Sequence, residues 1–175
     1  MNIRQARAED CAAIATIYNH AVLHTDAIWN EQTVDADNRI AWLNQRQQVG
    51  YPVLVACEDN GAIAGYASWG DWRAFEGFRH TVEHSVYVHP DHQGKGIALR
   101  LMEQLIAEAR RQGKHVMVAG IESRNRASLR LHEKLGFRVT AQMPQVGAKF
   151  GRWLDLTFMQ LQLDQRPLPD TQQSA

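Results

Sequence analysis

The chain has 175 residues, of which 45% are hydrophobic and 22% charged, so one folded domain with a full core is expected and a disordered chain is excluded. Lysine plus arginine and aspartate plus glutamate each number 19, so no excess of charge points to nucleic acid or to an anionic membrane. No apolar run is long enough to span a bilayer, and Cys11 and Cys57 have neither metal-site nor disulfide spacing. We therefore expect a cytoplasmic protein without a metal, a membrane or a nucleic-acid partner.

Hydrophobic periodicity and turn residues divide the chain into strands and helices. The negative charges of Glu9 and Asp10 favour the start of a first helix, and residues 20–29, which have no clear period, are expected to form a loop. The sequence Asp59-Asn60-Gly61 predicts a tight hairpin turn. Further helices are expected at 35–49, 97–112 and 123–135, and strands at 3–7, 51–58, 62–70, 81–88, 115–121, 137–143 and 153–163.

The order of these elements predicts the fold class. Most strands follow one another directly and should pair antiparallel, whereas strand 115–121 follows a helix and should lie parallel to strand 81–88. The chain is therefore expected to form one α/β (α+β) domain over residues 1–163, with a mixed, mostly antiparallel sheet flanked by helices. The polar, proline-containing residues 164–175 are expected to be a flexible tail.

The most informative stretch is the glycine-rich turn between strand 81–88 and the helix that begins at Ile97. A strand, a glycine-rich turn and a helix start place unpaired backbone N–H groups at one point, an arrangement that binds phosphates. A P-loop is excluded because Lys95 is followed by Gly96 and not by a hydroxyl residue, and a dinucleotide fold lacks its third glycine. The remaining pattern, Gln/Arg-x-x-Gly-x-Gly/Ala, is met by Gln93, Gly96 and Ala98. A turn that only caps the helix is the alternative for this hexapeptide alone.

This pattern resembles the acetyl-CoA signature of the GCN5-related N-acetyltransferases (GNAT). A second motif agrees with it: Asn125 opens a helix that ends in Leu-His-Glu-Lys-Leu-Gly-Phe at residues 131–137. In the family an asparagine at the Asn125 position binds the pantetheine arm of coenzyme A, although Asn125 also suits a plain helix N-cap. The order of predicted elements matches the family from end to end, so the resemblance implies the GNAT fold.

Within the family, the chain is most similar to the phosphinothricin and methionine sulfone–methionine sulfoximine acetyltransferases. The shared stretches are 27–29, 50–52, 65–67, 81–88, 131–133 and 149–153. This resemblance implies acetylation of the α-amino group of small L-amino acids or their toxic analogues, with acetyl-CoA as co-substrate, and a homodimer. Whether residues 149–153 of the last hairpin complete a neighbour's pocket is left open by the sequence.

The chemistry needs a base for the amine and an acid for the departing thiolate. Alternation along strand 81–88 places Glu83 on one face and His84 on the other. Glu83 falls on the family's catalytic glutamate and is the predicted base, with an ion pair to Arg73 or Arg79 as the alternative. Many relatives carry a tyrosine acid where this chain has His132, which is the predicted acid, or the base in place of Glu83. A histidine that is only hydrogen-bonded in the helix groove is the alternative for His132.

The remaining candidate residues fall into two groups. Backbone groups of the strand and the glycine turn, Asn125 and the charge of Lys134 are expected to hold coenzyme A, and a solvated side chain is the alternative for Lys134. That group comprises Val86, Tyr87, Val88, Gly94, Lys95, Gly96, Ile97, Ala98, Leu99, Asn125 and Lys134. Arg73 is the first choice for the substrate carboxylate, because a guanidinium matches a carboxylate, and Phe75 suits an aliphatic side chain. Glu76, Glu83, His84 and Ser85 complete the substrate group.

Two rival functions remain open at this point. A peptide N-acetyltransferase would need an open groove, whereas the aromatic and arginine residues at 71–79 favour a closed pocket. A regulatory domain that only binds coenzyme A would not need both Glu83 and His132. Direct transfer is expected because no cysteine or serine is placed to carry the acetyl group.

Overall fold

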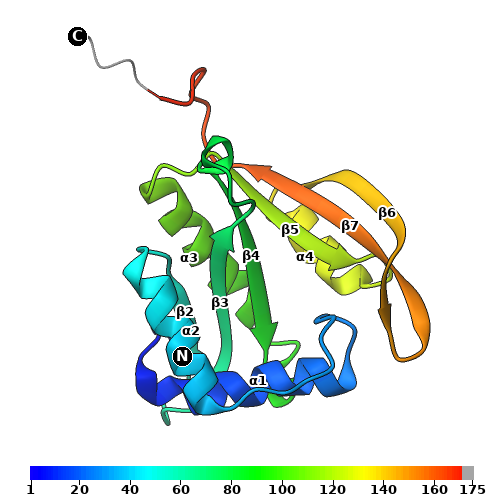
Figure 1. Ribbon diagram of the computed structural model, residues 1–175. Coiled ribbons are helices and arrows are strands. Elements are labelled where there is room, and N and C mark those ends of the chain that lie inside the picture. The colour runs from blue at the N-terminus through cyan, green and yellow to red at the C-terminus, as the bar shows by residue number, and fades with distance from the viewer. Residues whose placement is uncertain (171–175) are drawn as a thin grey trace.

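The computed structural model describes residues 1–170, and within them the chain forms one mixed sheet of seven strands in the order β1-β2-β3-β4-β5-β7-β6. All neighbouring strands are antiparallel except β4 and β5, which are parallel as the sequence predicts. The strands are β1 (Asn2–Gln5), β2 (Val53–Cys57), β3 (Ile63–Asp71), β4 (Thr81–Val88), β5 (Val116–Glu122), β6 (Arg138–Lys149) and β7 (Arg152–Gln162). β4 lies at the centre of this order (Figure 1).

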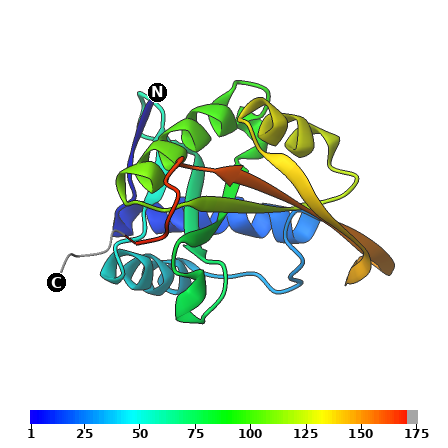
Figure 2. The same cartoon turned by 90° about the horizontal axis from the view of Figure 1, so that it is seen from above.

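Helices cover both faces of the sheet. The helices are α1 (Cys11–His24), α2 (Ala36–Gln48), α3 (Ile97–Arg111) and α4 (Arg126–Lys134), and short 3-10 turns occupy Ala8–Asp10, Glu76–Phe78 and Pro90–His92. Figure 2 shows α1 and α2 on one side of the sheet and α3 and α4 on the other. The two apolar layers follow from the alternation of side chains along the strands: Leu54 and Ala56 pack toward α3, and Val53 and Val55 pack toward α1 and α2. No helix among residues 1–170 is both long and apolar enough to cross a membrane.

The structure extends two elements beyond their predicted limits. α1 continues to His24, so the loop expected from residue 20 begins later, because Ala21 and Val22 are buried on its inner side. β6 runs to Lys149 and not only to residue 143. Pro144 ends a strand in most contexts, but β6 is an edge strand, and its pairing with β7 shifts between Met143 and Gly147. The proline therefore lies where no ladder bond is required.

The predicted tail divides into two parts. Asp164 lies 2.7 Å from His115 Nδ1, and Asp170 pairs with Arg79, so residues 164–170 contact the body of the domain. Residues 171–175 of the expected flexible tail lie outside the described residues.

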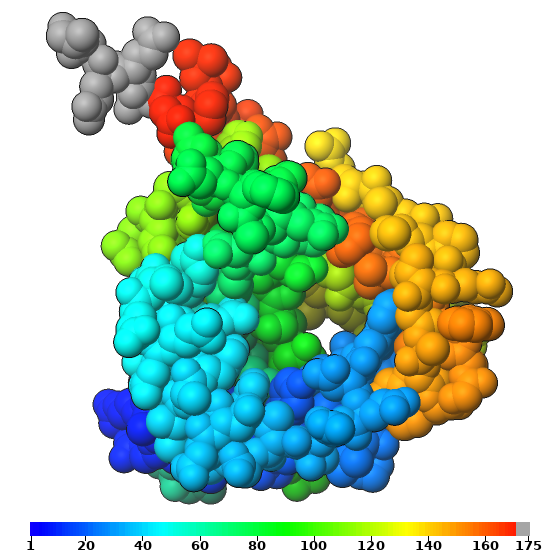
Figure 3. Space-filling view, viewed as in Figure 1, coloured from blue at the N-terminus to red at the C-terminus, as the bar shows by residue number. Residues whose placement is uncertain are grey.

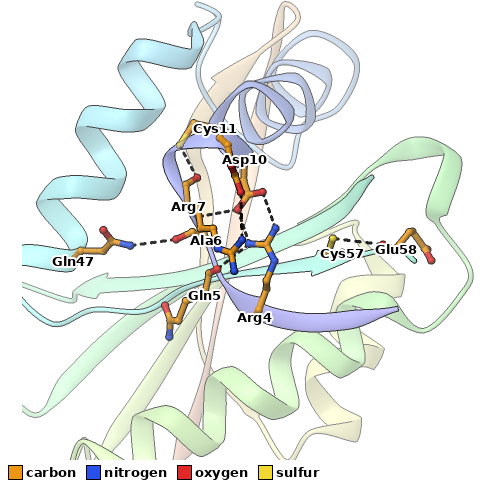
Figure 4. Close-up of polar contacts among 10 residues, drawn as sticks. Arg4, Gln5, Ala6, Arg7, Asp10, Cys11, Gln47, Cys57 and Glu58 are labelled. Carbon is orange, nitrogen blue, oxygen red and sulfur yellow. Dashed lines mark hydrogen bonds and ion pairs between the residues drawn. The ribbon is translucent and has the colours of Figure 1, made fainter. Parts of the chain in front are cut away.

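An ion pair with a buried carboxylate joins β1 to the start of α1. The Arg4 guanidinium donates to both carboxylate oxygens of Asp10 at 2.7 and 2.9 Å, and the Arg7 backbone N–H donates to the same carboxylate (Figure 4). Burial alone would raise the pKa of Asp10, but the hydrogen bonds from Arg4 and Arg7 outweigh it and hold that pKa below its usual value. A lowered pKa means that the carboxylate contributes stability at neutral pH and loses it as acid protonates Asp10.

We expect Asp10→Asn to lower the free energy of unfolding by about 2 kcal/mol, or Tm by roughly 4–8 °C, because it removes the charge of a buried carboxylate that accepts two hydrogen bonds from Arg4. Thermal unfolding at pH 7 measures the loss, and the difference from wild type should shrink as the pH falls below 4. Glu9→Gln, which removes an exposed pair with Arg7, is the matched control and should change stability by less than about 0.5 kcal/mol. Equal effects of the two substitutions would contradict the role given to Asp10.

Candidate active site

The two central strands separate halfway along their length. β4 and β5 pair only at Thr81–Val116, Val82–Met117 and Glu83–Val118, although β4 continues to Val88 and β5 to Glu122. Figure 1 shows the strands diverging toward the end of the sheet near α1 and α4, and Figure 3 shows a deep hollow at this position. The residues that follow Glu83 therefore border an opening in the middle of the sheet.

The hydrogen-bond pattern between β3 and β4 decides which backbone groups of β4 face this opening. The bonds from Trp72 N–H to Thr81 O and from His89 N–H to Ala64 O show that odd-numbered residues of β4 bond to β3. Even-numbered residues therefore direct their backbone groups toward β5, and beyond the last pairing these are Val86 and Val88. Of the three strand residues predicted to bind a cofactor, Tyr87 directs its backbone to β3 and only its side chain remains available.

Two cavities meet at the opening. The cavity of about 340 Å³ lies on the α2 side, and a smaller one of about 100 Å³ lies on the α4 side. Ala27, His84, Ser85, Tyr87, Gly120 and Glu122 border both cavities. A cavity of about 1030 Å³ lies at the other end of β4, between Arg79 and residues 166–170, and its Asp170 already pairs with Arg79 and His80. The predicted catalytic residues Glu83 and His132 border the two smaller cavities and not this one.

Glu83 borders the cavity on the α2 side, as its position on β4 predicts. Its carboxylate lies over Gly120 of β5, where a Cβ atom would stand 3.4 Å from Oε2. Burial raises the pKa of Glu83 above its usual value, and the positive charge of Arg73 opposes that effect. No ion pair involves Glu83 within residues 1–170, so the carboxylate is free to accept a proton from a ligand.

His84 and His132 form a buried pair on the α4 side of the sheet. Their Nε2 atoms are 2.9 Å apart and their rings stack with centroids 5.0 Å apart, while Phe137 packs edge-on against both. Burial lowers the pKa of His84 to about 3, assisted by repulsion from His132, and burial also lowers the pKa of His132. Both imidazoles are therefore neutral at pH 7. The sequence analysis does not predict that these two residues touch.

Arg46 of α2 is a site residue that the sequence reasoning did not identify. It borders the cavity of about 340 Å³ on the α2 side and donates to Ser68 Oγ at 3.2 Å. Within residues 1–170 it forms no ion pair. Burial lowers the pKa of its guanidinium, which nevertheless remains charged. The helical spacing could have identified it. Arg46 follows the inward residues Trp42 and Leu43 by four and three positions and so shares their helix face.

The loop at 71–80 lies differently from its prediction. Arg73, Phe75 and Glu76 are exposed and do not border the cavity, and the Arg73 guanidinium lies 4.9 Å from the Trp72 ring centroid. The 3-10 turn at Glu76–Phe78 directs the loop outward, leaving Phe75 80% exposed. The structure thus brings together Glu83, His84 and Ser85 of the predicted substrate group, but not these three residues. The α2-side cavity of about 340 Å³ is bordered instead by Trp29, Arg46, Asp71, Leu156 and Phe158.

The glycine turn has the geometry that a phosphate site requires. Gly94 and Gly96 have φ values of 76° and 74°, and a Cβ atom at either position would meet no atom within 4 Å. The turn therefore leaves room for a ligand beside the start of α3, where helical N–H groups have no intrahelical partner. Lys95 is exposed at the turn and Ala98 and Leu99 are half-buried, whereas the Ile97 side chain is buried in the core and contributes only its backbone.

Asn125 and Lys134 lie at the two ends of α4. The Asn125 side chain accepts a hydrogen bond from Ser128 N–H at 3.1 Å, which confirms the N-cap, and the residue also borders the smaller cavity. Lys134 is exposed in the last turn. Glu122, which the sequence reasoning did not identify, is buried beside Asn125 and accepts from Arg124 N–H at 2.8 Å.

The hairpin of β6 and β7 holds the loop that closes the site. Lys149 is buried in its own chain, where it donates to the carbonyls of Thr25 (2.7 Å) and Ile28. A Cβ atom at Gly147 would stand 2.3 Å from the Trp29 ring, so this glycine makes room for the tryptophan. The loop positions Ala27 and Trp29 at the cavities. Lys149 therefore supports the site of its own chain.

Comparison with known proteins identifies the family to which this chain belongs. Residues 11–137 match the acetyltransferase (GNAT) family, and this chain belongs to that family. The resemblance inferred from the sequence is thereby confirmed, and so is the predicted fold. The structure superposes on that of an acetyltransferase from Salmonella typhimurium, solved with its cofactor acetyl-CoA, with a TM-score of 0.94, 72% identity and 97% coverage of both chains. A ribosomal-protein-alanine N-acetyltransferase from Brucella melitensis gives a TM-score of 0.90 at 52% identity, over 93% of this chain and 99% of that one.

Curated relatives narrow the class further. The chain is 75% identical to the L-amino acid N-acyltransferase MnaT of Escherichia coli K12, over 97% of this chain and 98% of the relative. It is 72% identical to the L-methionine sulfoximine/L-methionine sulfone acetyltransferase of Salmonella typhimurium, over 97% and 99% of the two chains. Identity falls to 36% with a phosphinothricin N-acetyltransferase of Alcaligenes faecalis, over 93% and 82%.

Proposed function

We propose that this protein transfers an acetyl group directly from acetyl-CoA to the α-amino group of small L-amino acids, including methionine sulfone, methionine sulfoximine and phosphinothricin. The observation that carries the proposal is the pair of cavities that meet at the opening between β4 and β5. One is bordered by the carboxylate of Glu83 and the other by the imidazole of His132. Glu83 as base and His132 as acid would thus act from opposite sides of one opening. The relatives named above support the same reaction.

Among the residues that fit acetyl-CoA, Val86 and Asn125 border the smaller cavity. The N–H groups at the start of α3 and the Lys95 charge suit the pyrophosphate, and the backbone groups of Val86 and Val88 suit the pantetheine, as an added strand would. Val86 N–H is also placed to polarise the thioester carbonyl. Asn125 offers its amide N–H groups to the same arm, because its carbonyl oxygen already accepts from Ser128.

Arg46 is our candidate for the substrate carboxylate, in addition to Arg73. A guanidinium without an ion pair, half-buried in a cavity that also contains a catalytic carboxylate, matches the two charged groups of an amino acid. Arg46 would hold the carboxylate while Glu83 faces the amino group. Trp29, Leu156 and Phe158 provide the apolar part of the same cavity. Arg73, now outside, would have to move with its loop to make a second contact.

We expect the enzyme to release coenzyme A when it is supplied with acetyl-CoA and methionine sulfone, and Glu83→Gln to lower kcat/KM by about 10²–10⁴-fold. Because burial raises the pKa of Glu83, the wild-type kcat/KM should rise with pH through that pKa as the carboxylate ionises. The variant should lack this rise. Thiol release from pH 4.5 to 9 measures both effects.

The rivals give different results in the same assay. Turnover only with peptides that begin with alanine would replace the proposal with protein acetylation, a function favoured by the Brucella melitensis relative. If acetyl-CoA raised Tm but no acceptor released thiol, the chain would be a binding domain. If Glu83→Gln kept wild-type activity, Glu83 would not be the general base.

Arg46→Met should raise KM for the amino acid by about tenfold or more and leave KM for acetyl-CoA within about threefold, because it removes one charged hydrogen-bonding partner of the carboxylate. Arg73→Met is the matched comparison on the exposed loop. Steady-state kinetics with methionine sulfone and with its amide separates the two arginines. The variant that lacks the carboxylate-binding arginine should no longer discriminate between methionine sulfone and its amide. If Arg46→Met keeps the wild-type ratio of kcat/KM for acid and amide, Arg46 does not bind the carboxylate.

We also propose a homodimer in the reducing cytoplasm. The edge hairpin exposes apolar side chains that a second copy would cover, namely Val139, Met143, Val146, Phe150 and Trp153. Cys11 and Cys57 are free thiols, which suits a reducing compartment.

Sedimentation should show a dimer at micromolar concentration for the wild-type chain and a monomer for Trp153→Asp, because a charge in an apolar interface is not tolerated. Leu168→Asp, at an exposed apolar residue outside the hairpin, is the control and should remain dimeric. A wild-type chain that sediments as a 19.9 kDa monomer would contradict the proposal.

A further inference from the structure

The guanidinium of Arg46 occupies a place on the sheet that a side chain would normally fill. A Cβ atom at Gly70 of β3 would stand 3.1 Å from Nη1, 3.1 Å from Nη2 and 3.2 Å from Cζ of Arg46. Because these three distances are nearly equal, the flat face of the guanidinium lies against the strand, and not its edge. Glycine leaves room at this position for a planar group to approach the backbone closely.

Two further contacts hold the guanidinium in this position. Ser68 is fully buried and donates its hydroxyl proton to the backbone oxygen of Pro52 at 2.8 Å, so the same oxygen accepts from Arg46 Nη1 at 3.2 Å. The Trp42 ring lies one helical turn earlier on α2, with its centroid 5.4 Å from Arg46 Cζ. The guanidinium forms no other hydrogen bond within residues 1–170. Its remaining N–H groups are therefore available to a ligand in the cavity that Arg46 borders.

Gly70 lies directly opposite the predicted base. In the antiparallel ladder of β3 and β4, Gly70 pairs with Glu83. Side chains of residues that pair in this way point to the same face of the sheet. Arg46, which fills the side-chain position of Gly70, therefore lies on the same face as Glu83, over the neighbouring strand. The Glu83 carboxylate leans the other way, since its Oε2 lies 3.4 Å from the Cβ position of Gly120 on β5.

A cation and a carboxylate thus border one cavity without pairing with each other. Arg46 and Glu83 both border the cavity of about 340 Å³ on the α2 side, and no ion pair joins them within residues 1–170. An α-amino acid carries its two charged groups on one carbon atom, with the nitrogen and the carboxyl carbon about 2.5 Å apart. Such a molecule matches this pair of charges. An amine without a neighbouring carboxylate would leave the half-buried guanidinium without its partner.

We propose that Gly70 determines which acceptors the enzyme uses. It admits the Arg46 guanidinium to the place opposite Glu83, and so restricts efficient acetylation to molecules with a free carboxylate beside the amine. The proposal rests on the function proposed above, and it makes Gly70 and Ser68 positioning residues that act by fixing the guanidinium. A glycine with a purely structural role would affect stability and not this selectivity.

A graded series at Gly70 tests the proposal. Gly70→Ala adds one carbon atom within 3.2 Å of the guanidinium, and Gly70→Val adds two more while keeping a residue type that strands favour. We expect KM for methionine sulfone to rise by about fivefold in Gly70→Ala and by at least tenfold in Gly70→Val. KM for the amide of methionine sulfone, KM for acetyl-CoA and kcat should stay within about twofold of wild type. The rise of kcat/KM with pH through the pKa of Glu83 should remain.

Three further variants separate positioning from a general disturbance of the site. Gly77→Ala is the matched control, because a Cβ atom there would meet no atom within 4 Å, and it should keep the wild-type ratio of kcat/KM for acid and amide. In the Arg46→Met background, Gly70→Val should lower that ratio by less than about twofold further, since the group that it displaces is already absent. Ser68→Ala alone should lower the ratio by at least about threefold, because Arg46 Nη1 loses its acceptor.

Binding can be measured without turnover. Calorimetric titration of methionine sulfone into the enzyme with coenzyme A should give a dissociation constant that rises from wild type to Gly70→Ala and again to Gly70→Val. The amide should bind all three within about twofold. Equal losses for acid and amide, or multiplied losses when Gly70→Val is combined with Arg46→Met, would overturn the proposal.

The outcomes separate this proposal from the proposed function. Absence of turnover by the wild type would remove the acetyltransferase function, and the titrations would still decide whether Gly70 controls carboxylate binding. Turnover by the wild type with an unchanged ratio of acid to amide in folded Gly70→Val would overturn the role of Gly70 alone. If Gly70→Val fails to fold, Gly70→Ala and Ser68→Ala decide: a lowered ratio supports the proposal, and a wild-type ratio overturns it.

Discussion

The site depends on the separation of β4 from β5 after Glu83 and Val118. Pairing of the first three residues keeps the sheet continuous, and its loss afterwards opens the middle of the domain. The backbone groups of Val86 and Val88 then lack hydrogen-bond partners on a neighbouring strand. This is costly in a protein interior unless a ligand or water provides those partners. Parallel strands need a crossover connection, and here that connection begins with the glycine turn and α3. The crossover therefore places the glycine turn and the start of α3 next to the unpaired strand.

Stability elsewhere must offset this opening. The Arg4–Asp10 pair fixes β1 to α1, and the antiparallel ladders on both sides of the opening are continuous apart from local shifts. The loop that covers the cavities has little secondary structure of its own and relies on Lys149, whose ammonium binds two of its carbonyls. A buried lysine is expensive unless its donors are satisfied, so the hairpin and the loop determine one another's position.

The sequence predicted what depends on local pattern. Alternation on β4 separated Glu83 from His84, and glycine chemistry located the turn before α3. Three features depended on distant contacts and were not predictable in that way. Arg46 reaches the cavity only because α2 packs across β3, Pro144 lies within a strand only because β6 is an edge, and His84 meets His132 only because α4 packs on β4. Loop 71–80 was misplaced because its aromatic residues suggested burial, whereas Phe75 is exposed.

One environment tunes the three titrating groups in opposite directions. Burial disfavours charge, so it raises the pKa of Glu83 and lowers the pKa values of His84 and His132. A carboxylate with a raised pKa is a stronger base for an ammonium proton than an exposed glutamate. Two neutral imidazoles can each accept and donate a proton, whereas a charged imidazole could only donate. A more polar opening would weaken the base and charge the histidines together. The low polarity that makes the unpaired strand groups costly therefore also shifts the pKa values of these three residues.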